Sequence, residues 1–143
     1  MELDIAILSR QGGRSYNEDA CGHWNSDQHL VCVVADGAGG HGGGDIASRL
    51  AVQHVLERFV AQPDTQPAHA AQLVRSANQT VVGNQLPGTS QAHMHSTLVL
   101  QRRSLGNARV EDWAQRSRRA AQRVGIMLKL VDLQQRRHQI EQA

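Results

Sequence analysis

The chain has 143 residues, 40% of them hydrophobic, and a formal net charge of +2. This length suits one ordinary domain with a real hydrophobic core. No apolar run reaches the roughly eighteen residues of a transmembrane helix, and residues 1–10 lack the basic start and cleavage site of a signal peptide. We therefore expect a soluble, cytoplasmic protein with no membrane partner.

The small net charge hides a sharp division near Leu100. Residues 1–100 carry a charge of −4, whereas residues 101–143 carry +6 and seven of the glutamines. The change in composition is abrupt, so we predict a folded domain over residues 1–100 and an Arg/Gln-rich basic tail over residues 101–143.

Three strands are predicted in the first part of the chain, over residues 3–8, 20–24 and 30–35. The third is a continuous apolar, β-branched run, which is typical of a buried central strand. Cys21 and Cys32 lie in the second and third of these strands, outside any CxxC pair. This placement favours core thiols over metal ligands.

A glycine-rich loop over residues 37–44 follows, and its six glycines predict irregular backbone. Asp45 is the expected N-cap of a helix that ends before Pro63. A second helix is predicted over residues 68–82 and a further strand over residues 95–100. This order of elements predicts an α+β domain with helices packed on a sheet.

The basic tail permits two interpretations. Its apolar residues recur at spacings of three and four, which is compatible with a long helix. Gly125 interrupts that pattern and the apolar stripe is thin, so we favour a weakly specified or disordered segment.

Two groups of residues carry the chemistry. Arg14 precedes the adjacent carboxylates Glu18 and Asp19 at the entrance to a strand, and Asp36 ends the buried strand directly before Gly37. A carboxylate in a buried setting needs a cation or hydrogen-bond donors. Mg²⁺ and Mn²⁺ take carboxylate and carbonyl oxygens, so Asp19, Asp36 and the Gly37 carbonyl suit a divalent metal.

Three alternatives have to be weighed. The glycines at positions 37, 39 and 42 match the dinucleotide-binding pattern GxGxxG, but Asp36 would face the pyrophosphate and no acidic strand end follows at the expected distance. His41 could act as a general acid, and His93 and His95 could bind a metal, but a hydrogen-bonding or incidental role is the simpler interpretation. The basic tail could bind nucleic acid, although a solvated tail accounts for it as well.

Taken together, the two motifs resemble the PPM-type, or protein phosphatase 2C-like, Ser/Thr phosphatases of bacteria. Residues 14–19, RSYNED, are similar to the R-x-x-N-E-D signature of that family, and residues 35–48 are similar to its A-D-G-x-G-G-H-x-x-G-x-x-A-S block. Residues 94–99, MHSTLV, are a softer match to its M-G-T-T-L-V strand.

The resemblance implies a β-sandwich with flanking helices and Mn²⁺- or Mg²⁺-dependent hydrolysis of phosphoserine or phosphothreonine. It further implies that Arg14 grips the phosphate, that Asp19, Asp36 and Gly37 bind metal, and that Glu18 holds metal-bound water. Arginine suits phosphate because its planar donors pair bidentately. Phosphoprotein substrates are implied as partners, with a cognate kinase as a further expectation.

The resemblance covers about residues 3–100. The later G-D-S-R, D-G and D-N motifs of the family are not found after Leu100, so we expect a truncated domain with half of the metal site and doubtful activity. A non-catalytic remnant or a phosphoprotein-binding module is the alternative. A tail read in a shifted frame would have this composition, and so would a genuine alternative C-terminus.

Overall fold

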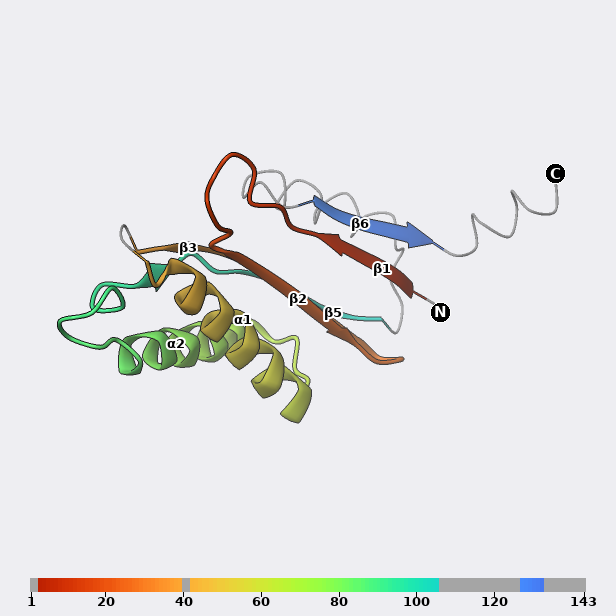
Figure 1. Ribbon diagram of the computed structural model, residues 1–143. Coiled ribbons are helices and arrows are strands. Elements are labelled where there is room, and N and C mark those ends of the chain that lie inside the picture. Colours follow the sequence, from red (N-terminus) through yellow and green to blue (C-terminus); the bar gives the residue numbers. More distant parts are fainter. Residues whose placement is uncertain (1–2, 40–41, 106–126, 133–143) are drawn as a thin grey trace.

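The computed structural model describes residues 3–39, 42–105 and 127–132. Its elements in chain order are β1 (Leu3–Leu8), β2 (Asp19–Asn25), β3 (His29–Ala38), α1 (Gly44–Ala61), α2 (Pro67–Gly83), β4 (His95–Ser96), β5 (Val99–Ser104) and β6 (Met127–Asp132). The fold is mixed α+β, as the sequence predicts (Figure 1).

Strand β3 is the centre of the main sheet. It pairs antiparallel with β2 along one side and with β5 and the short β4 along the other. Residues 30–35 are all buried, which confirms the prediction of a central strand.

Both faces of β3 are covered because its side chains alternate between two layers. Val31, Val33 and Ala35 pack against the helices, whereas Leu30 and Cys32 pack against Ile5 of β1 on the opposite face. Figure 1 shows the same layering, with α1 and α2 below the sheet and β1 above it. The continuous apolar run therefore follows from burial on both sides.

Phe59 anchors the helical layer. It is fully buried, and its ring lies edge-on to Trp24 and stacked on His69, with centroid distances of 6.1 and 6.2 Å. These contacts join α1 to both β2 and α2. Aromatic pairs of this kind add to the stabilisation from burial alone.

Both cysteines lie in strands, as predicted. Cys32 is buried on β3 and Cys21 is half-buried on β2. Burial raises the pKa of the Cys32 thiol to about 12, so this thiol stays protonated at neutral pH. A protonated, buried thiol behaves as a small core residue, in agreement with the sequence.

The start of α1 differs from the prediction. Gly43, with φ of 96°, is the N-cap, and Asp45 lies inside the first turn, where it pairs with Arg49. Glycine accepts this left-handed backbone angle, which other residues rarely adopt. The predicted capping role of Asp45 is therefore wrong, although its charge still lies near the positive end of the helix.

Two strand boundaries also differ. β3 runs past Asp36 through Gly37 to Ala38, because β4 provides a pairing partner for these residues. The strand predicted over residues 95–100 is divided into β4 and β5, and β5 continues across the predicted boundary after Leu100.

The described part of the tail is extended, where a helical or disordered segment was predicted. β6 pairs antiparallel with β1, from Leu3 opposite Asp132 to Leu8 opposite Met127. β1 and β6 form a two-stranded sheet of their own, and this pairing overrides a weak local preference for helix. Residues 106–126 and 133–143 lie outside the described residues. Within the described ranges, neither helix is apolar enough over a sufficient length to cross a bilayer.

Candidate metal centre

The β2–β3 ladder brings the two predicted aspartates together. Asp19 is the register partner of Asp36. Residues directly opposite each other in an antiparallel pair project to the same face of the sheet. Burial and the neighbouring Asp36 carboxylate raise the pKa of Asp19, so the ionised pair is unfavourable by itself and would be relieved by a cation.

Asp36 is only half-buried, whereas the sequence predicts a buried charge at the end of a buried strand. Water therefore reaches this side chain, and burial alone does not demand a metal. The stronger argument for a cation is the pairing with a second carboxylate, which only the register of the sheet shows.

Gly37 is needed for close packing. A Cβ atom at this position would overlap the carbonyl of Gly44 and lie 2.8 Å from the carbonyl oxygen of Glu18. The start of α1 therefore packs directly on the backbone of β3. The sequence predicts that the Gly37 carbonyl approaches an ion, and the packing of α1 is a second reason for a glycine at this position.

Arg14 and Glu18 lie in the loop between β1 and β2. Arg14 Nη1 is 3.4 Å from Glu18 Oε2, and the Tyr16 hydroxyl is 3.5 Å from Glu18 Oε1. The Arg14 side chain is 69% exposed, whereas that of Glu18 is 15% exposed beside the start of α1. The guanidinium is therefore accessible to an anion from solution, and the carboxylate is held against the protein.

Asn17 fixes the end of this loop. Its Nδ2 donates to Ser9 Oγ at 2.7 Å, and its Oδ1 accepts a hydrogen bond of 3.0 Å from the backbone N–H of Asp19. Asn17 therefore links Ser9, the residue directly after β1, to Asp19 at the start of β2. This role was not predicted, although the position of Asn17 in the RSYNED motif marks it as a candidate.

Thr97 and Ser96 were also given no role by the sequence analysis. The Asp36 carbonyl accepts a hydrogen bond from the Thr97 backbone N–H at 2.9 Å, and Ser96 Oγ lies 3.1 Å from the same oxygen. The Asp36 N–H donates to Thr97 Oγ1 at 3.0 Å. The sequence feature that pointed to these two residues was the partial match of residues 94–99, MHSTLV, to the pattern M-G-T-T-L-V.

The donor set fits a hard cation but is incomplete. Asp19 and Asp36 provide carboxylate oxygens, which Mg²⁺ and Mn²⁺ prefer. In the described part of the chain, no group of three or more acidic, histidine or cysteine side chains gathers around one point. His93 and His95 are exposed, with His95 Nδ1 2.9 Å from the His93 carbonyl, and His41 lies outside the described residues.

The glycines at positions 37, 39 and 42 do not form a dinucleotide-binding turn in this structure. That motif joins a strand of a parallel sheet to a helix. β3 instead pairs antiparallel with each of its neighbours β2, β4 and β5.

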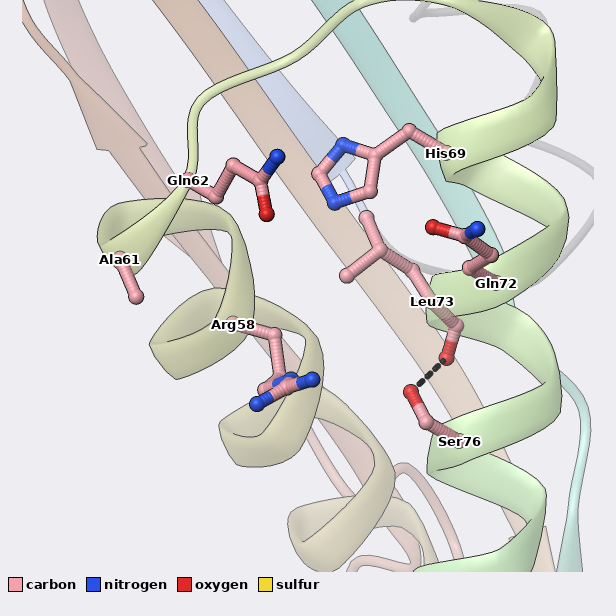
Figure 2. A pocket seen from close by; sticks show the side chains of 7 residues that line it. All are labelled: Arg58, Ala61, Gln62, His69, Gln72, Leu73 and Ser76. Atoms are coloured by element: carbon pink, nitrogen blue, oxygen red, sulfur yellow. Dashed lines mark hydrogen bonds between the residues drawn. The ribbon is translucent and has the colours of Figure 1, made fainter.

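A separate pocket of about 480 Å³ lies between α1 and α2 (Figure 2). It is lined by Arg58, Ala61, Gln62, His69, Gln72, Leu73 and Ser76. Arg58 lies fourteen residues after Gly44, the first residue of α1, which corresponds to roughly 20 Å along the helix axis. The pocket is therefore distant from the start of α1, where Glu18 lies. None of the predicted site residues lines this pocket.

The comparisons with known proteins point in one direction. The sequence model of a family described as Protein phosphatase 2C matches residues 9–123. No protein of curated function matches the chain.

Several solved structures of phosphatases have a fold similar to that of this chain. A bacterial serine phosphatase is 24% identical with a TM-score of 0.59, over 70% of this chain and 48% of that one. The PPM Ser-Thr phosphatase MsPP from Mycobacterium smegmatis is 26% identical with a TM-score of 0.52, over 70% and 38%. The S. agalactiae serine/threonine phosphatase is 20% identical with a TM-score of 0.57, over 71% and 44%. The chain thus spans less than half of these phosphatases.

Proposed function

Because this chain belongs to the protein phosphatase 2C family, we propose that it forms the phosphate- and metal-binding part of a Ser/Thr protein phosphatase. The reaction would be hydrolysis of phosphoserine or phosphothreonine with Mn²⁺ or Mg²⁺. One observation carries the proposal: Asp19 and Asp36 are register partners at the end of the loop that carries Arg14 and Glu18.

Each side chain has a chemical role in this proposal. Asp19 and Asp36 would hold a divalent ion, together with the Gly37 carbonyl. When bound, the ion supplies positive charge that neutralises phosphoryl oxygens and lowers the pKa of water. Arg14 would bind the substrate phosphate through its exposed guanidinium, and Glu18 would accept a hydrogen bond from the attacking water.

We expect little turnover from this chain by itself. Phosphatase chemistry of this kind uses two ions a few ångström apart. The described residues bring together the two carboxylates of Asp19 and Asp36, without a third acidic, histidine or cysteine ligand, to hold both ions. A single ion held by two carboxylates and water would leave most of the rate enhancement unrealised.

A second candidate function is binding of phosphorylated proteins without hydrolysis. The exposure of Arg14 favours it, because an accessible guanidinium can bind a phosphate whether or not a metal pair is complete. Phosphoprotein partners and a cytoplasmic location belong to either version of the proposal, and a cognate Ser/Thr kinase would supply the phosphorylated substrate.

The experiment measures binding and hydrolysis of a phosphothreonine peptide in millimolar Mn²⁺. We compare the wild type with Arg14→Ala and Asp36→Ala, and use Asp27→Ala, an exposed acid in the β2–β3 turn, as the matched control. We expect peptide binding that weakens in Arg14→Ala, with turnover far below about one per second.

Two results would change this view. Turnover of about one per second that is lost in both Arg14→Ala and Asp36→Ala would establish a working active site and contradict the expected low activity. Peptide binding and hydrolysis that are both absent in the wild type, or both unchanged in Arg14→Ala, would refute the phosphate-binding role.

A further inference from the structure

The backbone opposite Asp36 departs from a regular antiparallel ladder. Val34 faces Val99 and Gly37 faces Ser96, and this constant register places Thr97 directly opposite Asp36. Residues at a hydrogen-bonded position of such a ladder exchange two backbone bonds. Only one of the two is backbone to backbone here, from the Thr97 N–H to the Asp36 carbonyl at 2.9 Å.

The Thr97 hydroxyl replaces the second backbone bond. The Asp36 N–H donates to Thr97 Oγ1 at 3.0 Å, where a regular ladder would use the Thr97 carbonyl. That carbonyl instead accepts a hydrogen bond of 2.8 Å from Ser96 Oγ. This exchange accounts for the interruption between β4 and β5, since residues 97 and 98 leave the regular ladder.

Such an arrangement restricts the residue type at position 97. A regular ladder rung uses backbone atoms and accepts almost any side chain, whereas this rung needs a hydroxyl on the β-carbon. Valine has the shape of threonine without the hydroxyl, so it would leave the Asp36 N–H without its partner.

We propose that Thr97 is a positioning residue for the metal-binding carboxylate of Asp36. The inference rests on the proposed function, because it takes Asp36 to be a metal ligand. The Gly37 N–H donates to the Glu18 carbonyl at 3.0 Å on the β2 side, and Thr97 holds the Asp36 peptide from the opposite side. The backbone that carries the carboxylate is thereby fixed on both edges, which keeps the ligand oriented before the ion arrives.

The test uses three variants of the whole chain. Thr97→Val removes the hydroxyl at constant shape, Thr97→Ser retains it, and Thr65→Val makes the same change in the loop between α1 and α2. Amide hydrogen exchange at Asp36, followed by NMR without metal, directly measures the protection that the hydrogen bond to Thr97 Oγ1 gives to the Asp36 N–H. Mn²⁺ titration by calorimetry reports its effect on the ligand.

In Thr97→Val we expect Asp36 exchange to be about tenfold faster and Mn²⁺ affinity to be about threefold to tenfold weaker. Water reaches the half-buried Asp36 and replaces part of the lost bond, which limits the size of the effect. Thr97→Ser and Thr65→Val should resemble the wild type in both measurements. Rescue by serine separates a hydrogen-bonding role from a packing role.

Several outcomes would overturn the inference. One is wild-type Mn²⁺ affinity in a folded Thr97→Val variant, and another is loss of protection at Asp36 in Thr97→Ser. A third needs no variant: an Asp36 amide that exchanges in the wild type as fast as an exposed loop amide would show that the rung does not exist.

An Asp36→Asn variant distinguishes this inference from the proposed function. Loss of Mn²⁺ binding in Asp36→Asn but not in Thr97→Val rejects the positioning role and supports the metal assignment. Retention of Mn²⁺ binding in Asp36→Asn, or absence of binding in the wild type, rejects the metal assignment together with this inference.

Discussion

Replacing Asp19 by asparagine should stabilise the metal-free protein while it removes metal binding. The pKa of Asp19 is raised in the folded chain by burial and by the Asp36 carboxylate. A carboxyl group whose pKa is raised on folding destabilises the native state wherever it is ionised there. Asparagine keeps the shape, removes the charge and removes one oxygen ligand.

The size of the effect follows from the register. Charges about 5 Å apart, roughly the spacing of paired residues across a ladder, repel by ~1 kcal/mol in water and by ~3 kcal/mol at an effective dielectric constant of about 20. Asp19 is half-buried, so solvent screening favours the lower part of this range, about 1–2 kcal/mol. For a chain of this size, that gain corresponds to a rise in Tm of roughly 3–6 °C.

The assay is thermal unfolding in the presence of a chelator, at pH 7.5 and at lower pH, together with Mn²⁺ calorimetry. The advantage of Asp19→Asn should be full above the folded-state pKa and should disappear as the pH falls toward 3.8, the ordinary value for this carboxyl group. Asp27→Asn, in the exposed β2–β3 turn, is the matched control and should leave stability and Mn²⁺ binding unchanged.

The reasoning would be refuted if Asp19→Asn were no more stable than the wild type at pH 7.5. It would also fail if the difference persisted undiminished at low pH, because the effect would then not arise from ionised Asp19. Unchanged Mn²⁺ binding in the variant would remove Asp19 from the metal site.

Three further predictions concern the packing and burial of residues in the fold. Gly37→Ala should destabilise the protein by about 1–3 kcal/mol in urea unfolding, because its Cβ overlaps the backbone of α1, whereas Gly13→Ala, with open space around it, should cost much less. Phe59→Ala should cost about 3–5 kcal/mol in the same assay, because the ring is fully buried, and a loss under 1 kcal/mol would contradict its role as anchor. The pKa of His54 is lowered by burial and by Arg58, so stability should fall as the pH drops below 6.5, and the pH dependence of thermal unfolding should be smaller in His54→Gln.

The motif residues were predictable from the sequence because the chemistry restricts them strongly. Asp19 stands where a strand begins and Asp36 follows a buried apolar run directly before a glycine, and their residue types already indicated a hard cation. The buried central strand and the two helices were equally clear, since long apolar patterns determine such elements with little help from the rest of the chain.

Other features depended on which strands pair, and no local pattern contains that information. The extension of β3 through Gly37 required β4 as a partner, and β6 formed by pairing with β1 in a segment whose local pattern suggested a helix or disorder. Hydrogen bonds to a neighbouring strand can outweigh the backbone preference of glycine or the helix propensity of a basic segment.

The site itself shows the same division. The sequence predicted which side chains could bind a metal or a phosphate, because this depends on the chemistry of each residue type. Only the tertiary structure decided that Asp19 faces Asp36, and that the Thr97 hydroxyl takes the place of a backbone carbonyl opposite it. Both are contacts between residues far apart in the chain, and they exist because the sheet aligns three strands in one register.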